Sequence, residues 1–119
     1  MNYIIKLTVE IYAPDEILKE SGNTYAVMER TIDLNFVPSP ELLISINPEI
    51  AESESAKFSE LFNKVINPTG IFHVDRCVVY IGSNNKFDLE AKLLPLTENT
   101  LEGFLAAQEF LKFFGFLHR

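Results

Sequence analysis

Residues 71–93 read IFHVDRCVVYIGSNNKFDLEAKL, and this segment predicts a β-hairpin. Its first half, up to Gly82, is rich in β-branched and aromatic residues, which favour strands. Residues 87–93 alternate apolar and charged side chains, the pattern of a strand with one buried and one wet face. Between them, Ser83-Asn84-Asn85 is typical of a tight turn.

Three segments upstream of this hairpin also have the period-two pattern of strands. We expect them over residues 3–13, 24–37 and 42–46. In the second segment Arg30 falls in phase with the inward Ile32, so either a bulge changes the phase or Arg30 is paired or lies at a rim.

Two segments have apolar residues at helical spacing. Their predicted bounds are Ser53 or Ser55 to about residue 66, and Thr97 or Asn99 to about Phe114. Gly115 suits the C-terminal cap of the second helix. Residues 15–21 are long enough for a helical turn before Gly22-Asn23 breaks the chain.

The predicted order is strand, strand, strand, helix, strand, strand, helix, in one α+β domain over residues 1–119. Because hairpins join most neighbouring strands, we expect a mostly antiparallel sheet of four to five strands with two helices packed on one face. The order of the strands in the sheet does not follow from the pattern.

The charge of the chain excludes some partners. Ten Lys and Arg against 17 Asp and Glu give a net charge of −7, and basic residues form no cluster. Nucleic-acid binders need a basic face to neutralise phosphates, and anionic membranes also attract basic segments. We therefore predict that the chain binds neither nucleic acid nor membrane.

A few residues indicate the cellular compartment of the protein and whether it binds a metal. Residues 1–6 lack a signal-peptide pattern, and the single Cys77 fits a reducing compartment, so we predict a cytoplasmic protein. On a regular strand His73, Asp75 and Cys77 share a face, as zinc ligands or a Cys–His nucleophile pair would. The only other histidine is His118, so we expect no metal, no cofactor and a buried, inert Cys77.

Two arginines fall on otherwise apolar strand faces. Arg76 is in phase with Phe72 and Val74, as Arg30 is with Ile32. A buried arginine needs a carboxylate. The candidate partners are Glu29, Asp33, Asp75, Asp88 and Glu90. The alternative is a small-molecule or enzymatic pocket on a curved sheet, built from Arg30, Arg76, His73 and Asp75.

The last helix has more apolar surface than one sheet face would cover. Leu105 and Phe116 fall inside its narrow polar stripe. We therefore predict that Phe116 lies outside the core, where it contacts a partner protein or a second copy in a homodimer.

The acidic run from Glu49 to Glu60 suggests a kind of partner. Its carboxylates, Glu49, Glu52, Glu54 and Glu60, either form a solvated helix start or steer a protein that carries a basic patch. Together with the absence of a catalytic motif, they favour a small acidic protein-binding or inhibitor module without catalysis. In size and charge, though by no motif, the chain is similar to bacterial immunity proteins, which block basic toxins. A structural subunit of a phage or bacterial assembly is a further alternative.

Overall fold

The hairpin predicted from residues 71–93 is present. The computed structural model describes residues 2–22 and 25–119. In it, β4 (Ile71–Ile81) and β5 (Phe87–Leu93) pair antiparallel from Val74↔Leu93 to Ile81↔Phe87. Asn85 closes the turn with a φ of 58°, a left-handed conformation that asparagine tolerates well.

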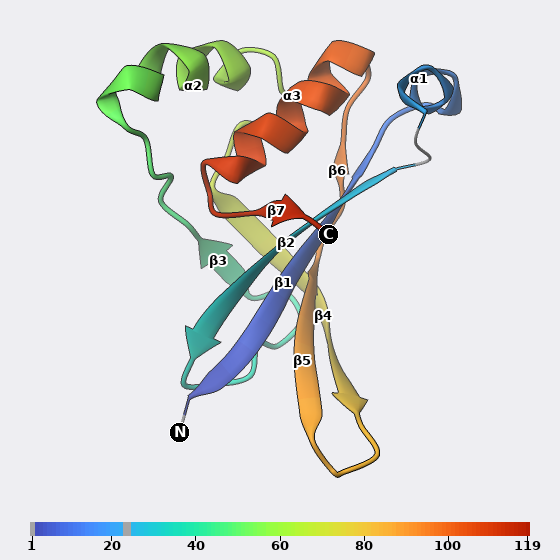
Figure 1. Ribbon diagram of the computed structural model, residues 1–119, viewed down its shortest axis with the longest axis vertical. Helices are drawn as coiled ribbons and strands as arrows, with labels where there is room; N and C mark the ends of the chain where they lie inside the picture. The colour runs from blue at the N-terminus through green and yellow to red at the C-terminus, as the bar shows by residue number, and fades with distance from the viewer. Residues whose placement is uncertain (1, 23–24) are drawn as a thin grey trace.

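A curled, mixed sheet forms the body of the molecule (Figure 1). Its other strands are β1 (Tyr3–Tyr12), β2 (Ala26–Leu34), β3 (Leu43–Ser45), β6 (Leu96–Thr97) and β7 (Leu117–His118). The order is β3-β4-β5-β1-β2-β7, with β6 also paired to β1. Position 24, in the predicted second strand, lies outside the described residues, as does position 23.

The α+β class is confirmed, but the sheet is larger and less uniform than expected. The described part of the chain has seven strands instead of four to five, because β6 and β7 have only two residues each and leave no alternation in the sequence. β1 pairs in parallel with β5 and β6 and antiparallel with β2. The central position of β1 therefore makes the sheet mixed.

Three α-helices lie at one end of the molecule, and the β4–β5 turn is at the other (Figure 1). They are α1 (Asp15–Ser21), α2 (Ser55–Phe62) and α3 (Leu101–Lys112), with a short 3-10 helix, η1 (Glu52–Glu54), before α2. The predicted caps of the last helix were wrong: the Thr100 hydroxyl accepts the Gly103 N–H at 2.9 Å, because Thr100 is the last extended residue.

The core lies between the inner face of the sheet and α3. β1 contributes Ile5, Leu7, Val9 and Ile11, all fully buried. Phe104, Leu111 and Phe114 are buried against this face. Leu105 lies on the polar side of α3 and is 50% exposed. We call the opposite side of the sheet, which carries Thr8, its outer face.

Phe116 lies in the core, so the prediction that it lies outside was wrong. Its side chain is 0% exposed, and its ring centroid is 5.2 Å from that of Phe72. The helix ends at Lys112, and Gly115 has a φ of 83°, which turns the chain back to the edge of the sheet, where β7 pairs with β2. A helical projection therefore does not apply to residue 116.

Candidate functional site

The four residues of the predicted small-molecule pocket do not come together. Arg30 stands opposite Leu7 on the inner face, whereas Arg76 stands opposite Lys92 on the outer face. His73 pairs with Leu43 near the far edge of the sheet, and Asp75 is exposed at a β-bulge between Val74 and Arg76. The geometry thus provides no shared pocket for these side chains.

The bulge explains why the strand faces were predicted wrongly. A bulge inserts one extra residue and reverses the alternation beyond it. Arg76 consequently leaves the face of Phe72 and Val74, and Cys77 moves onto the inner face, away from His73. Cys77 is half-buried instead of fully buried, and burial raises the pKa of its thiol. In the described ranges no three His, Cys, Asp or Glu side chains gather closely enough to hold a metal ion.

Arg30 is held by the backbone and not by the predicted carboxylate. Its Nη1 donates to the carbonyl oxygen of Phe114 at 2.7 Å. The guanidinium lies over Gly115, where a Cβ would approach its Nε to 3.0 Å. None of the ion pairs between described residues includes Arg30 or Arg76. The expected arginine–carboxylate pairs are therefore wrong for both residues.

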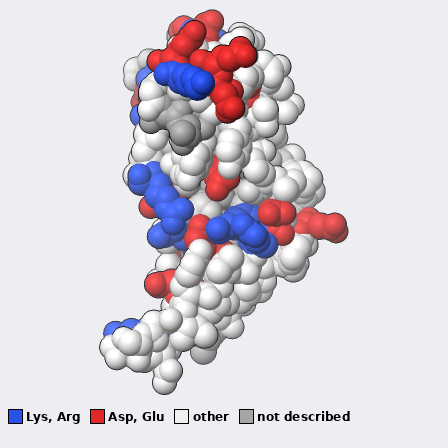
Figure 2. Space-filling view, turned by 90° about the vertical axis from the view of Figure 1, so that its right-hand side faces the viewer, with Lys and Arg blue, Asp and Glu red and all other residues white. Residues whose placement is uncertain are grey.

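Glu90 forms a polar centre on the outer face that the sequence did not indicate. Its side chain accepts the Thr8 hydroxyl at 2.8 Å and the Tyr80 hydroxyl at 2.9 Å. Burial opposes ionisation of Glu90, but these hydrogen bonds and the charges of Arg119 and Lys92 outweigh it and lower its pKa. Viewed from the right of Figure 1, basic and acidic groups lie side by side across the middle of the surface (Figure 2). Because these acidic and basic groups neutralise one another, we interpret them as a structural network.

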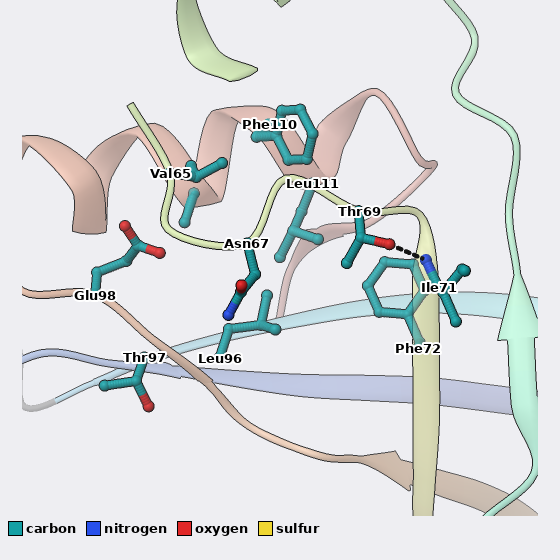
Figure 3. Close-up of a pocket in the computed structure, with 11 residues that line it drawn as sticks. Val65, Asn67, Thr69, Ile71, Phe72, Leu96, Thr97, Glu98, Phe110 and Leu111 are labelled. Carbon is teal, nitrogen blue, oxygen red and sulfur yellow. Dashed lines mark hydrogen bonds between the residues drawn. The ribbon is translucent and has the colours of Figure 1, made fainter. Parts of the chain in front are cut away.

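A second buried carboxyl, Glu98, lies beside a small apolar cavity below α3 (Figure 3). It is 4% exposed, and the Ile66 N–H donates to it at 3.2 Å. Burial raises the pKa of Glu98. The cavity between Leu96, Phe110 and neighbouring side chains has a volume of about 30 Å³, the space of a water molecule or two. Glu98 therefore joins the α2–β4 loop to the start of α3 and has no room for a substrate.

The predicted acidic run is exposed, and one of its carboxylates is paired with a lysine of the described chain. Glu60 on α2 pairs with Lys64 at 2.9 Å, and Lys57 lies 3.9 Å from Glu109. Glu49, Glu52 and Glu54 take part in none of the ion pairs that join described residues. These three carboxylates, together with Asp33, which is likewise in no such pair, are therefore available to a cationic partner.

A groove opens next to this acidic segment, between β2 and β3. It has a volume of about 700 Å³, in the range of sites that hold ligands. The turn from Phe113 to Gly115 also lines it. Half-buried aliphatic side chains from β2, β3 and the residue after β3 line it: Ile32, Leu34, Ile44 and Ile46. Its charged lining groups are Arg30, Asp33 and Glu49.

Of the predicted partner-binding residues, the four glutamates are on the surface and Phe116 is not. Sequence reasoning did not find the groove, because it requires that the sheet curl until β3 faces β2. No helix in the described part of the chain is long and apolar enough to span a membrane. Comparisons with models of protein families, with curated proteins and with solved structures gave no match.

Proposed function

We propose that this chain is a protein-binding module without catalysis of its own, and that its partner presents a basic surface. The observation that carries the proposal is the groove between β2 and β3, which aliphatic and polar groups line together, with carboxylates beside it that form no ion pair with a described residue. Partly exposed aliphatic side chains favour a macromolecular contact, and the carboxylates select its charge.

The other charged centres of the molecule fit this role less well. The outer-face network around Glu90 compensates its own charges, and the cavity beside Glu98 is too small for a ligand. A cytoplasmic location belongs to the same proposal, since an unpaired thiol such as Cys77 persists in a reducing compartment. Inhibition of a basic protein is one use of such a module.

Purification of the tagged protein from its native lysate, with mass identification of what it retains, tests the proposal. The candidate partner is then purified, and its dissociation constant is measured for the wild type and for Glu49→Gln/Glu52→Gln/Glu54→Gln. The matched control, Asp15→Asn/Glu16→Gln/Glu20→Gln on α1, removes the same charge from three exposed positions away from the groove.

We expect the first triple variant to bind at least about tenfold more weakly, as the loss of about 1.4 kcal/mol of attraction would cause. The α1 variant should stay close to the wild type. Equal affinities for all three proteins would reject the basic partner, and catalytic turnover of a retained molecule would reject the absence of catalysis.

A further inference from the structure

Only part of the β2 edge that faces away from β1 is paired with another strand. β7 pairs with it at Met28 and Glu29, and the Arg119 N–H donates to the Val27 carbonyl at 3.1 Å. In a strand, the N–H and C=O of successive residues point to alternate edges. Glu29, Thr31 and Asp33 therefore direct their backbone groups to the same edge as Val27. No described strand pairs with this edge at Thr31 and Asp33.

The opposite wall of the groove is β3, and no described strand pairs with its edge that faces away from β4. The Val74 N–H donates to Leu42 at 2.9 Å, and the Ile46 N–H donates to Gly70 at 2.8 Å. Residues 42, 44 and 46 thus direct their backbone groups towards β4, and Leu43 and Ser45 direct theirs away from it. Open edges of this kind are templates for an added strand.

The side chains of the groove determine what such a strand would look like. Ile32 and Leu34 from β2, Ile44 from β3 and Ile46 directly after β3 are half-buried and would pack on apolar side chains of the added segment. Residues of that segment facing the opposite way would meet solvent near Asp33. An alternation of apolar and polar residues matches both faces.

Charge selects among segments with this alternation. Asp33 and Glu49 line the groove, and Glu52 follows in η1. Arg30, the one cation among the described residues that line it, is bound to the Phe114 carbonyl. A segment with Lys or Arg at its polar positions would therefore be favoured. A second copy of this chain is a poorer occupant, because each molecule carries a net charge of −7.

We propose that the groove binds an extended, basic segment of a partner protein, which adds as a strand to the open edge of β2 at Thr31–Asp33 and packs its apolar side chains against β3. This inference rests on the proposed function and specifies the recognised chemistry and its backbone geometry. The added strand continues the edge that β7 already occupies at Met28 and Glu29.

The probe is a displayed library of random peptides of about ten residues, the length of a long strand. Selection on the wild-type protein should enrich peptides that alternate β-branched or aromatic residues with Lys or Arg. Methylation of single backbone nitrogens in a selected synthetic peptide should weaken binding at alternate positions, because every second N–H donates to β2. Tolerance of methylation at every position would overturn strand addition.

A pair of variants tests the edge on the protein itself. Thr31→Pro removes the N–H directed away from β1, and prolines are accepted at strand edges. Thr31→Val keeps that N–H and removes only the hydroxyl. We expect about tenfold or greater loss of peptide affinity for Thr31→Pro and little change for Thr31→Val, with circular dichroism as the check on folding. Equal affinity for a folded Thr31→Pro would contradict the proposal, and the methylation scan decides the matter if this variant unfolds.

Failure of this inference can be distinguished from failure of the proposed function. If basic peptides are selected and bind in a salt-dependent way but ignore Thr31→Pro and backbone methylation, strand addition is wrong and the basic partner stands. If the selected peptides carry no basic residues, the proposed function itself is contradicted. Self-association of the wild type that Thr31→Pro abolishes would show that a second copy is the occupant, which also overturns the inference.

Discussion

At the scale of single residues, two buried carboxyls have opposite environments. Glu90 and Glu98 are each 4% exposed. Glu90 accepts two hydroxyl hydrogen bonds and lies near Arg119 and Lys92, so its pKa is lowered despite burial. Burial raises the pKa of Glu98, and the hydrogen bond from the Ile66 N–H only partly opposes this effect. Equal burial thus has opposite consequences, because neighbouring groups determine which protonation state is favoured.

The raised pKa of Glu98 predicts a pH-dependent stability. The folded state binds the proton more tightly than the unfolded chain, so this residue's contribution falls as the pH rises above about 4. Glu98→Gln removes that slope, and its free energy of unfolding relative to the wild type should increase from about pH 4 to pH 7. Urea unfolding at several pH values measures this difference. A difference that declines over the range would contradict the raised pKa.

Glu90 should behave in the opposite way. Its lowered pKa makes a stabilising contribution that is present above the usual value of about 4.3 and is lost as the pH falls through the folded-state pKa. Relative to the wild type, Glu90→Gln should therefore become less stable as the pH rises from about 2 to 5. The same urea titrations apply. If the free energies of unfolding of the two proteins differ by the same amount at every pH, the pKa of Glu90 is not lowered in the folded state.

Phe116 should contribute as much to stability as Phe104 of α3. Because Phe116 and Phe104 are both fully buried, replacing either with alanine should cost about 3–5 kcal/mol of unfolding free energy. Phe87, at the exposed end of the hairpin, is the matched control and should cost less than about 1 kcal/mol. Denaturant unfolding compares the three variants. A Phe116→Ala cost close to that of Phe87→Ala would place residue 116 outside the core.

At the scale of elements, the β4–β5 hairpin extends beyond the core that it helps to form. Near the helices Phe72 and Val74 are buried on its inner face, whereas Ile81 close to the turn is 75% exposed. In Figure 1 the helices lie at one end of the molecule and the turn of the hairpin lies at the other. The tip of the hairpin therefore contributes little to the packing of the domain.

An insertion at this tip should be tolerated. A Gly-Ser pair added after Asn84 lengthens an exposed turn, and loop closure costs less than about 1 kcal/mol for so small an increase. The measurement is the free energy of unfolding in urea. The same pair inserted after Cys77 is the control, since it interrupts the paired part of the strand and should destabilise strongly. Unfolding of the tip variant would show that the turn itself is needed.

At the scale of the whole molecule, the negative charge is unevenly neutralised. The outer face pairs Lys6 and Arg119 with Glu29 at 3.9–4.0 Å, whereas no ion pair between described residues involves Glu49, Glu52 or Glu54. The field of the protein is therefore more negative beside the groove than its mixed outer face would suggest. The apolar surplus that favoured a homodimer is reduced as well, because Phe116 belongs to the core.

Salt should slow association with the partner. A net charge of −7 attracts a basic protein over distances that counterions screen, with a Debye length of about 10 Å at 0.1 M salt. The association rate should fall by about tenfold or more between low and high ionic strength, with a smaller change in the dissociation rate. Stopped-flow mixing with the purified partner measures both rates. Equal association rates at the two salt concentrations would exclude electrostatic steering.

Local patterns determined the elements of this fold. Alternation predicted β1, β2, β3 and β5, β-branched and aromatic composition predicted β4, and helical spacing predicted α3. The left-handed Gly115 was also predictable, because few other residues adopt a positive φ at the end of a helix. These features depend on neighbours in sequence, and the side chains alone specify them.

Tertiary structure decided what those elements bring together. The bulge that separates Arg76 from Phe72 and the parallel pairing that places Glu90 beside Thr8 leave no signal in the residues concerned. Gly115 indicates the end of a helix, but not that the turn there buries Phe116. The groove between β2 and β3 likewise requires the curl of the whole sheet. Contacts between distant segments are selected by the packing of the entire core, whereas a short sequence window reports only the periodicity of its own strand or helix.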